Sequence, residues 1–392
     1  MNDSLQAPAR RDAHTGMDDV TTATLSFLLR APLRSLQAHG CAAHLPRGGT
    51  ASLATRVAAF FAAPRAGLPL LVGALPFDPE ADDALHQPVW LASEAPVPTP
   101  AAPRFRGTLA AEPTPAGYAA AVKQALLQLQ QPIPQLHKVV LARSLHLQCE
   151  QPLDPAELAA RLGHDPSVAT YLLPLPVATQ DAPAWLVGAT PELLVSRRGS
   201  QVLSHPLAGS ARRSADPVED ARTAQALLAS AKDHDEHRHV VEAIVAALVP
   251  WCTHVAADAR PSLHATATMW HLGTRIQATL RDASTPVAAL VAALHPTPAV
   301  CGTPRQRALD TIRALEPVPR GFYAGAVGWT DADGDGDWYV AIRCARVQGR
   351  QVRVYAGAGI VADSQPALEV AETAAKFVAL LNALGVDELP SA

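Results

Sequence analysis

The sequence has few cysteines, no excess of basic residues and no long hydrophobic run. Its five cysteines, in 392 residues, show no CxxC spacing, which argues against a disulfide framework and a zinc knuckle. The net charge of −4 argues against nucleic acid or an anionic membrane as the main partner. Neither a signal-peptide-like apolar segment nor a run of about 18 apolar residues is present. We therefore expect a cytoplasmic protein that is neither exported nor membrane-spanning.

The length predicts more than one structural unit. A single core seldom grows beyond about 250–300 residues, and 48% of this chain is hydrophobic. We expect a flexible N-terminus over residues 1–20, a variable N-terminal lobe over 21–104 and a main domain over 113–388. The proline-rich segment PVPTPAAP (96–103) suits an extended connector between the last two.

The hydrophobic patterns predict an α+β fold with a mainly antiparallel core. Strands separated by short turns alternate with amphipathic helices. The expected strands cover 68–77, 138–147, a meander over 184–213, a hairpin over 321–347 around DADGDGD, and 351–360. The expected helices cover 117–130, one long helix over 217–248, and a helix from 366.

Two predicted helices carry carboxylates that suit a hard divalent cation. Glu369 and Glu372 recur with Lys376 at helical spacing on one face, although a solvated helix with an ion pair is the alternative. Glu236 lies on the inward stripe of its helix, where a carboxylate needs a cation or hydrogen-bond donors. Together the three carboxylates suit Mg²⁺.

The acidic loop from Asp331 to Asp335 opens like an EF-hand calcium loop. Its twelfth position is Ile342 instead of Glu, and its flanks are predicted strands. We therefore interpret it as a hairpin turn.

Several charged residues stand among apolar neighbours. Lys138 begins a strand, where the alternative is a lysine that extends to the surface. Glu192 follows a proline between two strands and can face a cavity lined by a sheet. Arg343 and His271 on apolar strands suggest an anionic ligand, with a satisfied core histidine as the alternative for His271.

Nine ordered segments across roughly residues 115–385 resemble the chorismate-utilising enzymes, most closely the isochorismate synthases of siderophore pathways. They are KVVLAR (138–143), GATPELL (188–194), PLAGSARR (206–213), LLASAKDHDEH (227–237), TMWHL (268–272), HPTPAVCG (295–302), GFYAGAVGW (321–329), AIRCA (341–345) and YAGAGIVADSQPALEVAETAAK (355–376).

The resemblance implies two stacked, mainly antiparallel sheets surrounded by helices, with the active site of a chorismate-binding domain in the cleft between them. It implies that Mg²⁺-dependent addition of water at C2 of chorismate, with loss of the 4-hydroxyl, gives isochorismate. Lys138 then matches the water-activating base, Glu192 the acid, and His271 a residue over the ring near the leaving group.

The same resemblance assigns the remaining site residues. Glu236 and Glu372 match the two Mg²⁺ ligands, and Glu369 an indirect or additional ligand. Arg343 matches the residue that binds the enolpyruvyl carboxylate. The other substrate-binding positions are Gly209, Ser210, Ala299, Tyr355, Gly357, Gly359 and Lys376.

Four positions distinguish members of the family. Ala208 stands where some aminodeoxychorismate synthases carry a nucleophilic lysine, and Lys138 favours water over ammonia as the nucleophile. Ala299 stands where salicylate synthases usually have threonine. Ala231 departs from a glutamate common in siderophore-type members.

The alternatives to a siderophore-type isochorismate synthase are a salicylate synthase, a menaquinone-type isochorismate synthase and a non-catalytic relative. We expect a monomer with transient contact to a downstream isochorismatase.

Overall fold

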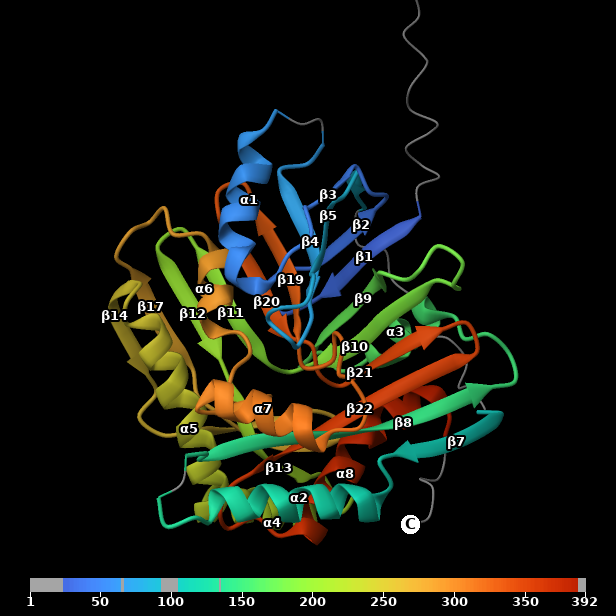
Figure 1. The fold of residues 1–392 in the computed structure, drawn as a ribbon, viewed down its shortest axis with the longest axis vertical. Coiled ribbons are helices and arrows are strands. Elements are labelled where there is room, and N and C mark those ends of the chain that lie inside the picture. The colour runs from blue at the N-terminus through green and yellow to red at the C-terminus, as the bar shows by residue number, and fades with distance from the viewer. Residues whose placement is uncertain (1–23, 65–66, 93–104, 134, 387–392) are drawn as a thin grey trace, which may run out of the picture.

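The computed structural model describes residues 24–64, 67–92, 105–133 and 135–386. The predicted flexible N-terminus at 1–20 and the proline-rich connector lie outside these residues. Two large antiparallel sheets dominate the described part and meet in one hydrophobic core (Figure 1). The predicted α+β class with two mainly antiparallel sheets is confirmed.

In the described residues, the larger sheet has ten strands, and every pair in it is antiparallel. In spatial order they are β18 (Gly302–Thr303), β8 (Lys138–Cys149), β22 (Gln351–Ile360), β21 (Cys344–Gln348), β10 (Ala184–Thr190), β9 (Ala169–Leu175), β1 (Leu25–Arg30), β2 (Leu36–His39) and β6 (Trp90–Leu91), with β7 (Gly107–Glu112) also paired to β8.

The second sheet has nine strands within the same described ranges. They are β14 (Cys252–Ala257), β17 (Ile276–Leu280), β12 (Gln201–His205), β11 (Leu193–Arg198), β20 (Gly336–Val340), β19 (Ala326–Asp331), β4 (Leu70–Leu75), β5 (Ala84–Gln87) and β3 (Ala43–His44). A small sheet that the sequence did not predict joins β13 (Leu207–Arg212), β16 (Met269–Gly273) and β15 (Ser262–Ala265).

Helices cover the outer faces of the sheets. They are α1 (Leu53–Ala62), α2 (Pro115–Leu129), α3 (Pro155–Leu162), α4 (Pro217–Ala229), α5 (Ala231–Leu248), α6 (Val287–Leu294), α7 (Arg305–Leu315) and α8 (Pro366–Leu384). Helix α8 begins at a proline and ends at Gly385, whose left-handed backbone stops it. It packs on β22 beside α2, at the bottom of Figure 1. Among the described residues, no helix is both long and apolar enough to cross a membrane.

The prediction of one long helix over 217–248 is wrong. Ser230 has an extended backbone and separates α4 from α5, and its hydroxyl accepts a hydrogen bond from the backbone N–H of Asp233. A serine in this position is a strong helix N-cap. The break fixes the direction of α5 independently of α4, and α5 carries Glu236.

The predicted meander over 184–213 is confirmed for the antiparallel pair of β11 and β12 and wrong for the strands before and after them, because the chain passes between sheets at prolines. After β10 in the larger sheet, Pro191 and Glu192 lead to β11 in the second sheet, and Pro206 leads from β12 to β13 in the small sheet. A proline cannot donate the hydrogen bond that continues a strand pair. Glu192 therefore lies where the chain crosses from one sheet to the other.

A second crossing returns the chain to the larger sheet. The expected strand through Ala341, Ile342 and Arg343 is broken there, between β20 and β21. The two crossings run side by side, because the backbone of Arg343 accepts from Ala189 and that of Glu192 accepts from Val340. Their proximity brings Glu192 and Arg343 to one place between the sheets. The Asp331–Asp335 loop is the turn of the β19–β20 hairpin, as predicted.

The strands of residues 25–91 belong to both large sheets. β1, β2 and β6 extend the larger sheet beyond β9, and β4, β5 and β3 extend the second sheet beyond β19. Core residues of this segment, such as Phe27 and Leu71, share one cluster with Leu141 of β8. The N-terminal segment thus packs as a continuation of both sheets.

Candidate active site

A small enclosed pocket lies where the two crossings, the small sheet, β22 and α8 meet. It has a volume of about 60 Å³. Eleven of the residues assigned from the sequence line it: Glu192, Gly209, Ser210, Glu236, His271, Ala299, Arg343, Tyr355, Gly357, Gly359 and Lys376. The structure therefore brings together residues as far apart in the sequence as Glu192 and Lys376. The other three assigned residues, Lys138, Glu369 and Glu372, are not among those that line it.

Lys138 lies at the start of β8 with its side chain fully buried. Its Nζ is 3.1 Å from Oε1 of Glu236, which α5 directs inward as predicted. Gly359 makes this approach possible, because a Cβ atom at that position would lie 2.0 Å from the same Oε1. The surface alternative for Lys138 is excluded. At this distance the buried ammonium and carboxylate form an ion pair, and each charge offsets the cost of removing the other from water.

Glu192 is only 2% exposed and lines the pocket from the first crossing. Burial raises the pKa of its carboxyl from 4.5 to about 8, against the opposing influence of Lys138, a backbone hydrogen bond from Leu207, Lys376 and Arg343. The carboxyl group is therefore mostly protonated at neutral pH. A neutral carboxyl group in a closed pocket is a proton donor, as a general acid requires.

Arg343 and His271 contact each other across the pocket. The guanidinium Nη2 lies 3.3 Å from Nε2 of His271. Burial, together with the positive charge of Arg343, holds the pKa of His271 well below its ordinary value, so the imidazole is neutral and accepts this hydrogen bond. The backbone φ of Arg343 is 51°, a left-handed value that is unfavourable for a residue other than glycine. The strained crossing directs a cation into the pocket, as expected for binding an anionic ligand.

Each of the three predicted metal-binding glutamates is paired with a lysine. Glu236 pairs with Lys138, Glu369 with Lys232 at 2.7 Å, and Glu372 with Lys376 at 2.6 Å. Among the described residues, no group of three or more His, Cys, Asp or Glu side chains is arranged to hold a metal ion. The expected cluster of Glu236, Glu369 and Glu372 is therefore not formed, because each carboxylate extends toward its own ammonium.

The chemistry of these side chains nevertheless fits a hard divalent cation. Burial raises the pKa of Glu372, but Lys376 and Lys232 outweigh it and hold the pKa below its ordinary value, so this carboxylate is ionised. Burial and the nearby Glu372 raise the pKa of Glu369 to about 7. Mg²⁺ commonly takes one or two protein carboxylates and completes its shell with water and substrate oxygens. Glu236 and Glu372 as its direct ligands stay a prediction.

Two neighbours of Glu236 were missed by the sequence interpretation. Lys232 and Asp233 were given no role from the sequence, yet both are half-buried, and the charges of Glu236 and Glu372 act on both. Their spacing of four and three residues before Glu236 puts them on one helix face, which was the available signal.

The remaining substrate-binding residues form the floor and walls of the pocket. Gly209 has a φ of 80° at an irregularity in the β13–β16 pairing, and Ser210 pairs with His271. The Ser210 hydroxyl donates to Glu372, and Lys376 donates to the backbone oxygen of Gly357.

Aromatic rings and one alanine complete the wall. Tyr355 stacks on Tyr323, with ring centres 4.9 Å apart, and both line the pocket with Ala299. Tyr323 was not assigned from the sequence, although it lies in a segment that carried the resemblance. All the substrate-binding positions predicted in this wall are thus at the pocket.

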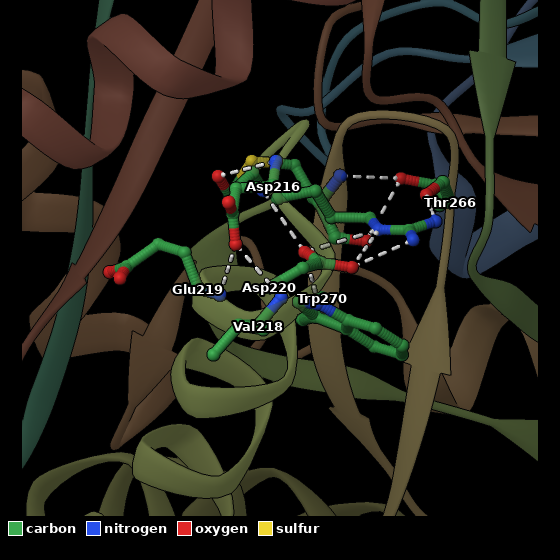
Figure 2. A network of polar contacts seen from close by, with 9 residues as sticks. Asp216, Val218, Glu219, Asp220, Thr266 and Trp270 are labelled. Carbon is green, nitrogen blue, oxygen red and sulfur yellow. Dashed lines mark hydrogen bonds and ion pairs between the residues drawn. The ribbon is translucent and has the colours of Figure 1, made fainter.

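The hairpin of β15 and β16, which carries His271, is anchored to the start of α4 (Figure 2). The carboxylate of Asp220 accepts from Arg213, from the backbone N–H of Ser214 and from the indole N–H of Trp270. Hydrogen bonds from Arg213 lower the pKa of Asp220 to about 2. Arg213 also donates to the backbone oxygen of Thr266. This network fixes the turn end of the hairpin.

The comparisons with known proteins agree with this geometry. The family described as chorismate binding enzyme matches residues 78–385, and the chain belongs to it.

Individual relatives extend the likeness to nearly the whole chain. The chain is 42% identical to the isochorismate synthase DhbC of Bacillus subtilis (strain 168), over 93% of this chain and 94% of that protein. It is 35% identical to the isochorismate synthase EntC of Escherichia coli (strain K12), over 93% and 97%. The crystal structure of DhbC from Bacillus anthracis matches with a TM-score of 0.88 and 41% identity, over 93% of this chain and 97% of that chain.

Proposed function

We propose that this chain is an isochorismate synthase, which converts chorismate to isochorismate with Mg²⁺. The observation that carries the proposal is the protonated Glu192 in the wall of the pocket, together with the buried Lys138, whose partner Glu236 lines the same pocket. Addition of water and loss of a hydroxyl need one group that accepts a proton and another that donates one. The similarity to DhbC and EntC over nearly the whole chain supports the same reaction.

The two proton transfers balance across the reaction. To act as the base, Lys138 first gives up the proton of its ammonium form, and its neutral amine then takes a proton from the water whose oxygen bonds to C2 of the ring. The double bonds shift, the bond between C4 and its hydroxyl oxygen breaks, and Glu192 gives its proton to the leaving oxygen. One water enters and one leaves, so substrate and product are isomers.

Cationic groups bind the two carboxylates of the substrate. Arg343 faces the pocket with N–H groups that suit the enolpyruvyl carboxylate, and His271 orients the guanidinium from the other side. Glu236 and Glu372 would hold Mg²⁺, with Glu369 beside them, and the ion would supply positive charge against the ring carboxylate.

We place the enzyme in the cytoplasm and in siderophore biosynthesis. All five cysteines are free and four are buried, which suits a reducing compartment. The chain is 38% identical to the vibriobactin-specific isochorismate synthase of Vibrio cholerae, over 81% of this chain and 80% of that protein. Its action as a monomer stays a prediction, which gel filtration with light scattering checks.

Product analysis tests the proposed function. Purified protein is incubated with chorismate and Mg²⁺, and the products are resolved by liquid chromatography with a separate enzymatic assay for pyruvate. We expect isochorismate without pyruvate. Salicylate with equimolar pyruvate identifies a salicylate synthase instead, and unchanged chorismate in the presence of tight binding identifies a non-catalytic relative.

A further inference from the structure

A second and much larger cavity adjoins the active-site pocket. It has a volume of about 660 Å³, within the range of roughly 300–1,000 Å³ usual for small-molecule sites. Its walls come from the end of α3, the loop that follows α3, the tip of the β15–β16 hairpin and the C-terminal half of α8. The active-site pocket, at about 60 Å³, is far below that range.

The two spaces share Pro191 and Arg343. Both residues belong to the crossings between the sheets, so the shared wall is made of chain that is outside regular strands. The other walls of the active-site pocket include the buried residues Val140 and Val300. A ligand that enters from the large cavity meets the guanidinium of Arg343 first.

The large cavity favours an anion. Arg161 and Arg343 line it, and Arg161 is held in its wall by the backbone oxygen of Ala383 and by Glu157. One carboxylate, Asp165, also lines it and accepts hydrogen bonds from neutral groups, namely Ser167 and the backbone N–H of Ala267 at 2.7 Å. The lining thus carries two guanidinium groups and one carboxylate. Unequal charge of this kind raises the local concentration of an oppositely charged ligand.

The hairpin tip forms a wall that is held at two points. Thr266 and Trp270 are held by Arg213 and Asp220 in the network described above (Figure 2), and Ala267 donates a hydrogen bond to Asp165 of the loop after α3. Thr268, next to Ala267, lines the cavity.

We propose that this cavity is the entrance vestibule of the active site, which binds the cyclohexadiene dicarboxylate substrate before Arg343 passes it inward. The proposal rests on the proposed function for the identity of the ligand. It predicts that filling the cavity slows both entrance and exit of the ligand and leaves the equilibrium affinity unchanged, since the final contacts lie elsewhere.

Ligand-binding rates test the vestibule. Mg²⁺-loaded protein that carries Glu192→Gln, in which turnover is suppressed, is mixed with chorismate in a stopped-flow instrument, and binding is followed by tryptophan fluorescence in this background for every variant. Ala383→Phe fills the cavity from α8 and Thr268→Phe fills it from the hairpin. Ala246→Phe, at an exposed position of α5 outside the cavity lining, is the matched control.

We expect association and dissociation rate constants to fall together by at least about tenfold in both filling variants, with Kd within about threefold of the wild type and no change in the control. Wild-type rates in well-folded filling variants overturn the proposal, as does a weakened Kd with an unchanged association rate. If Ala383→Phe does not fold, Ala383→Leu replaces it. Wild-type protein that binds chorismate but makes no isochorismate overturns only the proposed function. The association and dissociation rate constants of the filling variants still test whether the ligand enters through the large cavity.

Discussion

Replacing Glu192 by glutamine is expected to remove activity and to stabilise the protein. In the wild type the buried carboxyl has a pKa of about 8, compared with 4.5 for an ordinary glutamate. The folded state therefore holds a proton that the unfolded state releases between these two values. Because the folded state binds more protons in this window, the free energy of unfolding falls as pH rises from 4.5 and the loss is complete above 8.

The size of this effect follows from the pKa difference. One pH unit corresponds to about 1.4 kcal/mol. Keeping Glu192 protonated therefore lowers the free energy of unfolding of the wild type by about 1.4 kcal/mol at pH 5.5 and by about 3 kcal/mol at pH 7. Glutamine has nearly the same shape, cannot ionise and keeps an oxygen for the hydrogen bond from Leu207. Glu192→Gln therefore does not lose unfolding free energy as the pH rises.

Urea denaturation at several pH values measures this difference. The stability of Glu192→Gln relative to the wild type should increase by about 1.4 kcal/mol per pH unit between pH 5 and 7.5. A constant packing change shifts both curves equally, so the slope is the decisive quantity. Turnover should fall by about 10²–10⁴-fold, and wild-type turnover should decline above pH 8 as the acid form is lost. A pH-independent stability difference refutes the assignment of the raised pKa.

Three further variants test the rest of the pocket. Lys138→Met leaves Glu236 buried without its cation. We therefore expect the free energy of unfolding to fall by about 3–5 kcal/mol and turnover to become undetectable. A variant as stable as the wild type in urea contradicts the ion pair. Arg343→Lys removes the two parallel hydrogen bonds available to a guanidinium and should raise KM by about tenfold with little change in kcat, so a kcat defect alone argues against carboxylate binding. In Gly359→Ala the new Cβ displaces the Glu236 carboxylate, and calorimetry should show weakened Mg²⁺ binding; wild-type affinity excludes Glu236 as a ligand.

Local sequence patterns were sufficient for most elements and for the composition of the site. Periodicity placed β4, β8, β22 and α8, and the inward stripe of α5 placed Glu236 in the interior. The resemblance supplied pocket residues from distant segments, whose proximity no local pattern contains. Ala299 is an example, since nothing in its own chemistry indicates a site.

What the sequence did not predict depends on long-range geometry. The division of neighbouring strands among three sheets depends on partners far along the chain, so Glu192 was predicted between two strands and Arg343 within a strand, and not at adjacent crossings. The partners of Glu236 and Glu369 were equally hidden, because Lys138 and Glu236 are 98 positions apart and Lys232 lies on another helix than Glu369. Only the pair of Glu372 and Lys376 followed from helical spacing. The left-handed backbone of Arg343 is imposed by the crossing and is not an arginine preference.

The origin of the new hydroxyl oxygen tests the central claim most directly. If Lys138 activates water while Glu192 assists loss of the 4-hydroxyl, the reaction in ¹⁸O-labelled water must give isochorismate with one ¹⁸O atom at C2 after a single conversion, detected by mass spectrometry of the product and its fragments. Isochorismate formed without label would contradict the account, because the oxygen would then have moved within the substrate.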